Sequence, residues 1–334
     1  MSSAIVPFSD EQMRLIVNLE QQYEVWIAAE RAVSAMPYGM KWKQISGREY
    51  LYEMLDRQGN GKSLGVRSSE TEAIFDQYQA DKEAAKARLQ SSSIRLSETC
   101  RLYRTLRLPL LASEAAGILR EADRREMLGS QLLVVGTNAM PAYSIEAAGR
   151  ILEAPDETDD FDLAWTAMES EGTPVWSMLQ AVDGTYTMNS ERTFQVRNAK
   201  AHEVELLVAP SRASGMQRRD RPLPVPLEEQ EWLLNGTPVS RVVVARDGSP
   251  ARIVAPDPRW FALQKLWMSE QAKRNPLKRP KDAKQGIALL NTIREAMPQY
   301  PLDEAFEASL PSELVPLYEA WKMQQRTVSP PTGW

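Results

Sequence analysis

The sequence predicts an α+β protein in which a small mixed α/β core lies between helical regions. Three observations indicate this fold class. Residues 1–128 show helical spacing of apolar side chains almost throughout. Residues 129–256 contain short apolar runs and an Asp-Gly turn, which are typical of strands and hairpins. Residues 257–334 return to helical spacing, so we expect a helical N-terminal region, an α/β core and a helical C-terminal region.

The composition restricts the chemistry that the chain can carry. The 334 residues are 43% hydrophobic, which is enough for a substantial core, and the formal net charge of −5 argues against a surface that wraps nucleic acid as a whole. Cys100 is the only cysteine, which excludes an intramolecular disulfide framework. His202 is the only histidine, which excludes Ser-His-Asp and multi-histidine metal chemistry within one chain. Catalysis would therefore depend on carboxylates, lysines, arginines, hydroxyls or a metal held by oxygen.

The sequence also predicts where in the cell the protein is found. No apolar run approaches the roughly 18–20 residues that span a bilayer, and no signal peptide opens the chain. We therefore expect a soluble cytoplasmic protein without a membrane partner.

Capping patterns mark the helices of the N-terminal region. A Ser-x-x-Gln box at Ser9 begins a helix over 9–36, and a Ser-x-x-Glu box at Ser69 begins a long helix over 69–106. A third helix is expected over 113–127.

The segment between the first two helices contains Gly61-Lys62-Ser63, which resembles part of a phosphate-binding loop. Such a loop needs a glycine where this chain has Asp56. We therefore interpret the segment as a flexible loop that carries a basic residue.

Apolar runs predict the strands of the core, and capping residues predict the later helices. Strands are expected at 131–136, 161–165, 193–197, 203–209, 241–245 and 251–255. The third and fourth are expected to form a hairpin, and the last two form another, joined by Asp247-Gly248. Helices are expected over 138–151, 257–273, 280–297 and 312–325.

The stretch "DETDDFDLAW" at 156–165 combines acidic residues with an apolar strand. Asp160 and Asp162 flank Phe161, so on a strand both carboxylates point to one face. Same-face aspartates repel each other unless a cation lies between them, and Mg²⁺ is the usual cation for such oxygen ligands. Glu205 would supply a third acid from a neighbouring strand. A solvated acidic turn is the alternative, and we expect loop positions for three other acids: Asp156, Glu157 and Asp159.

Gly136 and Thr137 lie where a buried strand ends and the helix from Asn138 begins. Backbone N–H groups, the helix dipole and the Thr137 hydroxyl suit an anionic phosphate at this point. Capping of the helix by Thr137 is the alternative, and it is compatible with a phosphate contact.

The order of these features resembles the nucleotidyltransferase fold of the polymerase-β superfamily. The resemblance rests on Gly136-Thr137 at a strand end, a helix, Asp160-x-Asp162 on a strand and Glu205 on a later strand. It implies a polymerase-β-like nucleotidyltransferase core between the two helical regions.

Other segments resemble a narrower group. The long gap between the strand-end glycine and the first aspartate is similar to that of bacterial toxin-type nucleotidyltransferases of the abortive-infection kind. Residues 38–65 and 255–290 look like the N- and C-terminal regions of a bacterial family described only as nucleotidyltransferase-fold proteins.

The resemblance implies a role for each candidate residue. Three acids would be catalytic and would hold two Mg²⁺ ions: Asp160, Asp162 and Glu205. Six residues would bind the nucleotide: Gly136, Thr137, Asn138, Lys265, Lys281 and Asp282. From the residues alone, Glu205 remains compatible with an exposed strand position and Lys265 with an ordinary solvated lysine.

The resemblance further implies transfer of a nucleoside monophosphate from an NTP, such as ATP, to an acceptor hydroxyl, with release of pyrophosphate. RNA, particularly a tRNA 3′ end, is the acceptor suggested by toxin-like relatives, and basic clusters at 211–222 and 278–284 would contact it. An antitoxin partner would accompany a toxin-like role. The alternatives are a catalytically inactive nucleotide-binding regulatory protein, a protein-nucleotidylating enzyme and an interaction scaffold.

Overall fold

The computed structural model describes residues 3–155, 160–169, 174–214 and 221–328 and divides the chain into two compact units. One unit contains Met1–Val17 and Cys100–Trp334, and the other contains Asn18–Thr99. Helices and small sheets occur together in the chain, which confirms the α+β class. The division into three regions at residues 128 and 256 stays a prediction.

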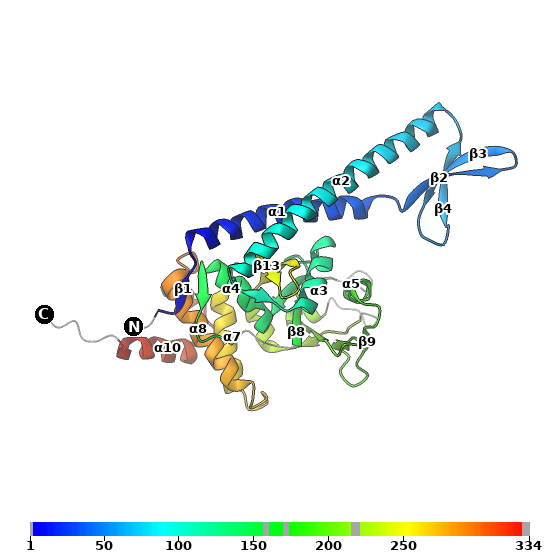
Figure 1. The fold of residues 1–334 in the computed structure, drawn as a ribbon. Helices are drawn as coiled ribbons and strands as arrows, with labels where there is room; N and C mark the ends of the chain where they lie inside the picture. Colours follow the sequence, from blue (N-terminus) through cyan, green and yellow to red (C-terminus); the bar gives the residue numbers. More distant parts are fainter. Residues whose placement is uncertain (1–2, 156–159, 170–173, 215–220, 329–334) are drawn as a thin grey trace. The chain divides into compact units, whose positions relative to one another are not determined.

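The unit Asn18–Thr99 consists of helical segments and a three-stranded antiparallel sheet (Figure 1). The helices are α1 (Asp10–Ala35) and α2 (Ser69–Thr105), and the strands are β2 (Gly39–Ile45), β3 (Arg48–Met54) and β4 (Gly61–Val66). Gly61-Lys62-Ser63 therefore lies in a strand, and the expected flexible loop is wrong because these residues pair with β3.

The cap of α1 agrees with the prediction and the cap of α2 corrects it. The Ser9 N–H donates to Gln12 Oε1 at 2.8 Å, and the Gln12 N–H donates back to Ser9 Oγ at 3.3 Å. At α2 the reciprocal pair is Ser68 and Thr71, one residue before the expected box. Glu72 is not part of this cap because its carboxylate binds Arg67 at 2.7 Å.

The other unit is built on a mixed sheet. The strand order is β6-β8-β11-β10-β9, and β12 pairs with β11 outside this path. The strands are β6 (Leu132–Val135), β8 (Asp160–Trp165), β9 (Thr187–Met188), β10 (Gln195–Arg197), β11 (Glu203–Val208) and β12 (Val225–Pro226). β8 and β11 are parallel, whereas β6–β8 and β10–β11 are antiparallel, so the expected hairpin of β10 and β11 is confirmed.

A second sheet in this unit contains the Asp-Gly hairpin. β13 (Val239–Ala245) and β14 (Pro250–Ala255) are antiparallel, as predicted, and β5 (Leu110–Leu111) adds to β13. Helices α3 (Ser113–Arg124) and α4 (Met140–Glu146) pack on this hairpin, and α5 (Pro174–Val182) packs beside α3.

The helix expected over 138–151 is shorter than predicted. A 3₁₀ turn, η1 (Thr137–Ala139), precedes α4, and the helix ends at Glu146. Ala148 has φ of +50°, a left-handed conformation that interrupts the helix. The chain then forms β7 (Gly149–Ile151), which pairs with β1 (Ile5–Pro7) near the N-terminus, a partner that local sequence cannot reveal.

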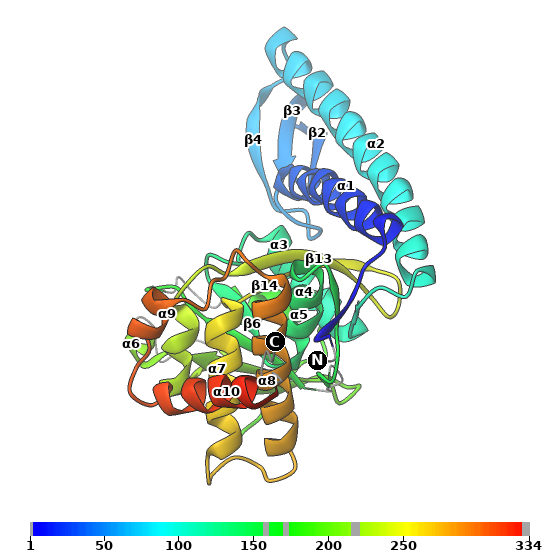
Figure 2. The ribbon, with the colours of Figure 1, turned by 90° about the vertical axis from the view of Figure 1, so that its left-hand side faces the viewer.

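Helices form the C-terminal part of the same unit. They are α7 (Pro258–Glu270), α8 (Arg279–Ala296), α9 (Glu304–Ala308) and α10 (Val315–Val328). α7 and α8 lie side by side (Figure 2), and Gly286 permits their approach because a Cβ there would lie 2.7 Å from Leu266 Cγ. Asp257 caps α7 as predicted, accepting from the Arg259 N–H at 3.0 Å. In the described parts of the chain, no helix is both long and apolar enough for a bilayer crossing.

Candidate active site

The acidic side chains of β8 and β11 share one face of the mixed sheet. The parallel register aligns Asp160 with Glu203 and Asp162 with Glu205. Side chains alternate along a strand, so these four acids point to the same side. Their neighbours Phe161, Val204 and Leu206 are fully buried on the opposite side, which fixes the orientation of both strands. The sequence-based expectation that Glu205 lies on a strand beside the two aspartates is therefore confirmed.

The glutamates are held by the next strand. Gln195 lies opposite Glu205 on β10, and its Nε2 donates to Glu203 Oε2 and Glu205 Oε1, both at 3.0 Å. Arg197 forms an ion pair with Glu203. Gln195 is buried, so it has little freedom to release these oxygens by turning. Glu205 is thus oriented by a polar partner that does not neutralise its charge.

Asp160 is held from two directions. Lys278, in the segment between α7 and α8, contacts its carboxylate with an Nζ–Oδ2 distance of 2.7 Å. Asn138 donates from Nδ2 to the Asp160 backbone carbonyl at 3.0 Å. The candidate Asn138 therefore positions the start of β8, a direct structural link between η1 and the acidic strand.

Asp162 is surrounded by negative charge. Desolvation raises the pKa of this carboxyl, and so do the carboxylates of Glu205 and Asp160; against the opposing effect of Lys265 and Lys278, the pKa rises from 3.8 to about 6. The carboxylates of Asp160, Asp162 and Glu205 repel one another, and a cation bound between them would relieve this repulsion. The field at Asp162 therefore favours cation binding.

Gly136 brings the end of β6 against this carboxylate. Its φ is +75°, in the left-handed region that favours glycine. A Cβ at this position would overlap the Asp162 carboxylate. Val135, the preceding residue, pairs with Asp162 across the antiparallel β6–β8 ladder. Both the backbone conformation and the close approach therefore require glycine.

The Thr137 hydroxyl is positioned by Gln285 of α8. Gln285 is fully buried, and its Nε2 donates to Thr137 Oγ1 at 3.3 Å and to the Pro155 carbonyl. Because Thr137 Oγ1 accepts this bond, its own proton is available to an acceptor such as a phosphate oxygen. Within the described residues, Gln285 Oε1 is buried without a hydrogen-bond partner.

The predicted residues of α7 and α8 form one buried ion cluster. Lys265 Nζ lies 3.0 Å from Asp282 Oδ1, and Arg274 Nε lies 2.8 Å from Asp282 Oδ2. Lys265 and Asp282 are only 4% and 2% exposed. Desolvation, together with Lys265 and Lys278, lowers the pKa of the Lys281 ammonium. Positive charge is therefore concentrated beside the acidic face.

The acidic face has the donor set of a hard-cation site. Among the residues that the structure describes, no three acidic, histidine or cysteine side chains converge as a ready metal cage. The oxygens of Asp160 and Glu205 are instead bound by Lys278 and Gln195. The acids on this face offer only oxygen donors, which are the ligands that Mg²⁺ prefers, so the residues present fit this ion.

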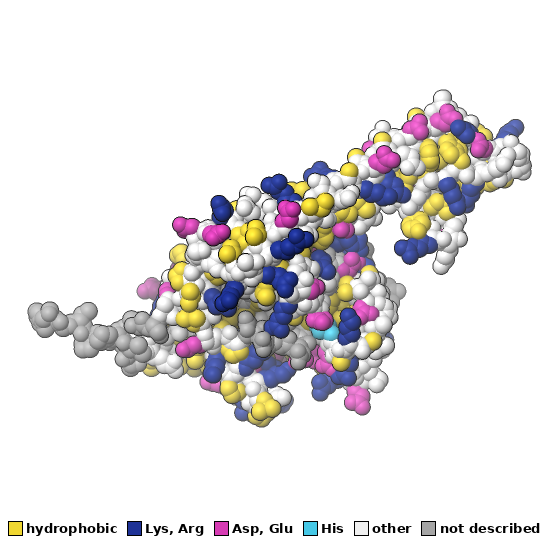
Figure 3. All heavy atoms as spheres, viewed as in Figure 1, with side chains coloured by type: hydrophobic (Ala, Val, Ile, Leu, Met, Phe, Trp, Pro, Cys, Tyr) yellow, Lys and Arg dark blue, Asp and Glu magenta, His cyan; other side chains and the backbone are white. Residues whose placement is uncertain are grey.

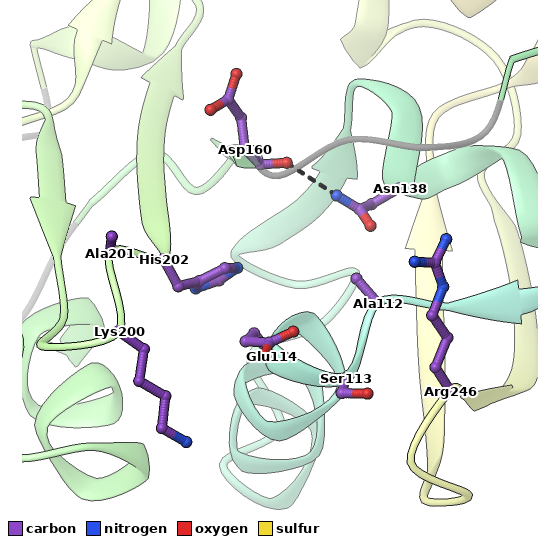
Figure 4. Close-up of a pocket in the computed structure, with 9 residues that line it drawn as sticks. All are labelled: Ala112, Ser113, Glu114, Asn138, Asp160, Lys200, Ala201, His202 and Arg246. Atoms are coloured by element: carbon purple, nitrogen blue, oxygen red, sulfur yellow. Dashed lines mark hydrogen bonds between the residues drawn. The ribbon is translucent and has the colours of Figure 1, made fainter.

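A pocket of about 380 Å³ lies beside the start of β8 (Figure 4). Figure 4 shows Asn138 directed at the Asp160 carbonyl, while the Asp160 carboxylate points away from Glu114. His202 is half-buried: its Nδ1 lies 3.0 Å from the Tyr186 hydroxyl, and its ring stacks on Phe161. The lining residues are Ala112, Ser113, Glu114, Asn138, Asp160, Lys200, Ala201, His202 and Arg246.

The structure brings the predicted residues into two neighbouring groups. The first is on the sheet and η1, and the second is on α7 and α8; Lys265 acts electrostatically on Asp162 and thereby links them. The expected loop acids Asp156, Glu157 and Asp159 lie outside the described residues.

Sequence reasoning missed the part that four residues play in holding the site, and three of them carried a local signal. Glu203 is two residues before Glu205 and so shares its face. Gln285 lies three residues after Asp282, on the same helical face. The hairpin places Gln195 opposite Glu205. Lys278 gave no such signal, because its contact joins residues 118 positions apart.

The segment that carries this face matches a known protein family. A family model described as nucleotidyltransferase matches residues 113–311, more than half of the chain. A crystal structure of an antigenic nucleotidyltransferase-like protein from Paracoccidioides brasiliensis is similar to 66% of this chain and 92% of its own, with 15% identity and a TM-score of 0.35. No curated protein matches the chain.

Proposed function

The chain belongs to this nucleotidyltransferase family, and we propose that it transfers a nucleoside monophosphate from an NTP to an acceptor hydroxyl, releasing pyrophosphate. The observation that carries the proposal is the alignment of Asp160, Asp162 and Glu205 on one face, with Gly136 against the Asp162 carboxylate. The order of α3, β6, α4, β8, α5 and β11 supports the polymerase-β-like core that the sequence resembles.

We propose that Asp160, Asp162 and Glu205 hold Mg²⁺ at a site for two ions. Bound there, Mg²⁺ would supply Lewis-acid stabilisation of phosphate oxygens and lower the pKa of the acceptor hydroxyl. The hydrogen bond of Gln195 holds Glu205 from the β10 side, and the ion pair with Lys278 reduces the charge repulsion at Asp160 until a ligand displaces it.

The remaining candidates would bind the triphosphate. The backbone at Gly136 can approach a phosphate closely because no side chain intervenes. The Thr137 hydroxyl, accepting from Gln285, would donate to a phosphate oxygen. Lys265 and Lys281 would offset the negative charge that develops on the leaving pyrophosphate, with Asp282 holding Lys265 in place.

We propose RNA, particularly the 3′ end of a tRNA, as the acceptor. The basic side chains Lys278, Arg279 and Lys284 in and before the first turns of α8 suit a polyanion near the acidic face. A toxin-like role with an antitoxin partner stays a prediction from the resemblance.

The test is transfer of label from each α-labelled NTP in Mg²⁺, with and without total tRNA. Asp162→Asn keeps the shape of the side chain and should reduce transfer by at least about a hundredfold, because the loss of a metal ligand removes several kcal/mol of stabilisation. Glu191→Gln, at an exposed site on the same unit, is the matched control and should transfer at the wild-type rate.

The position of the label separates the alternatives. Label on RNA supports the proposed acceptor, and label on the chain or another protein indicates protein nucleotidylation. NTP binding without transfer indicates an inactive regulatory protein. Equal transfer by wild type and Asp162→Asn would remove the acidic face from the mechanism.

A further inference from the structure

The two faces of the β2–β3–β4 sheet differ in what they contact. Trp42 of β2 lies opposite Leu51 of β3, which is fully buried, and the ring centroids of Trp42 and Phe75 of α2 are 5.8 Å apart. The central carbon of the Arg67 guanidinium lies over the Trp42 ring, 5.0 Å from the ring centre. This face is therefore packed against α2.

The opposite face carries basic and aromatic side chains. The register places Lys41 opposite Tyr52, Lys43 opposite Tyr50 and Ile45 opposite Arg48. Alternation puts these residues on the side away from Trp42. Lys41 and Arg48 are exposed, and Lys43 Nζ lies 4.4 Å from the centre of the Tyr52 ring. We call this set the Lys-Tyr face: Lys41, Lys43, Arg48, Tyr50 and Tyr52.

Charge is segregated between the two faces. Within β2 and β3, both described in full, the acidic side chains Glu49 and Glu53 lie on the α2 side, opposite Gln44 and Met40. Glu49 is bound there by Arg67 at 2.7 Å. Residues 38–68 contain six basic and three acidic side chains, a net charge of +3 in a chain whose net charge is −5. Figure 3 shows Lys and Arg side chains beside hydrophobic ones at this sheet.

We propose that the Lys-Tyr face binds single-stranded RNA. Aromatic side chains interleaved with cations form a platform on which unpaired bases stack while the cations contact phosphates. Tyr50 and Tyr52 are two residues apart on one strand, about 7 Å, a spacing that suits one base on each ring. A base on Tyr52 would displace the Lys43 ammonium, which lies over that ring. The bases of a duplex are already stacked on one another and cannot use this platform.

This inference rests on the smaller unit and does not depend on the proposed transferase activity. Asp162→Asn, which should abolish transfer, should bind RNA with unchanged affinity. If the proposed transferase activity fails its test, the proposal of RNA binding is unaffected, and the reverse also holds.

The test is fluorescence anisotropy of a labelled single-stranded RNA of mixed sequence with the full chain. Tyr50→Leu/Tyr52→Leu should weaken binding about tenfold or more, because base stacking is lost. Tyr50→Phe/Tyr52→Phe keeps the rings and should retain binding. Lys41→Gln/Lys43→Gln should lower the slope of log affinity against log salt by about 1.4, since each phosphate contact on a single strand contributes about 0.7.

Two exposed cations on α2 provide the matched control. Lys86→Gln/Arg88→Gln removes the same charge as the Lys41/Lys43 variant and should leave the affinity within about twofold of wild type, since distant surface charges contribute little. Circular dichroism of every variant checks that the sheet is folded, and the salt slope of the Lys41→Gln/Lys43→Gln variant decides the outcome if the Leu variant unfolds. Wild-type affinity in a folded Leu variant, equal binding of duplex and single strand, or binding only to phosphatidylserine vesicles would overturn the proposal.

Discussion

The acidic face of β8–β11 and the Lys-Tyr face of β2–β3 use the same strand alternation for opposite purposes. The first gathers carboxylates from two strands about forty residues apart, and partners on β10 and in the segment between α7 and α8 restrain them. The second gathers cations and tyrosines from one hairpin, and Lys41 and Arg48 are exposed on it. The comparison shows that the sign of the charge decides what each sheet face can bind: the carboxylates favour a cation, whereas the lysines and Arg48 favour a polyanion.

The largest expected effect concerns Gly136. Gly136→Ala would place a methyl group against the Asp162 carboxylate at a backbone conformation that alanine disfavours, so transfer should fall about a thousandfold through misplacement of the acid. Single-turnover transfer with labelled NTP measures the loss. Gly184→Ala, where a Cβ meets nothing within 4 Å, is the control and should retain the wild-type rate.

Removal of Asp282 should destabilise the fold. Asp282→Asn leaves Lys265 buried without its carboxylate and should lower the free energy of unfolding by about 3–5 kcal/mol, as measured by urea denaturation. Glu307→Gln interrupts the more exposed pair with Lys322 and should cost less than about 1 kcal/mol. Equal losses in the two variants would contradict the distinction between buried and exposed charge.

The raised pKa of Asp162 predicts a pH dependence of stability. The folded pKa of about 6 lies above the ordinary 3.8, so the folded state binds the proton more tightly and stability falls as pH rises between these values. The full penalty is about 3 kcal/mol, at about 1.4 kcal/mol for each pKa unit. Without divalent cations, Asp162→Asn should therefore be more stable than wild type above about pH 7, with the difference vanishing near pH 4. A thermal unfolding series across this range tests it; a difference that grows toward low pH would reverse the sign.

The smallest expected effect is at Gln285. Gln285→Met keeps the side-chain volume but removes the bond to Thr137, worth about 1 kcal/mol, so KM for the NTP should rise about fivefold with a smaller change in kcat. Gln299→Met, at the exposed amide that binds Glu146, should leave both constants unchanged. A fall in kcat alone would assign Gln285 a different role.

The sequence predicted those parts of the site that depend on local periodicity. Alternation around Phe161 placed Asp160 and Asp162 on one face, and the apolar pattern around Glu205 placed it on a strand. These predictions hold because hydrophobic burial of alternate residues leaves the acids only one side of the sheet.

Local periodicity could not predict contacts between segments that are far apart in the chain. Lys278 reaches Asp160, Gln285 reaches Thr137, and β7 ends the predicted helix by pairing with β1. Each of these depends on the packing of elements far apart in the chain, which no local pattern encodes. The helix cap at Ser68 differs by one residue from its predicted position because Glu72 binds Arg67 instead.

The central claim, that the shared face of β8 and β11 binds a divalent cation, is tested most directly by Mn²⁺ binding. Electron paramagnetic resonance of free Mn²⁺ in the presence of a non-hydrolysable ATP analogue would compare wild type, Asp160→Asn/Asp162→Asn and the Glu191→Gln control. We predict that wild type and Glu191→Gln deplete the free Mn²⁺ signal beyond the analogue alone, whereas the double variant does not. Equal depletion by all three proteins would contradict the account.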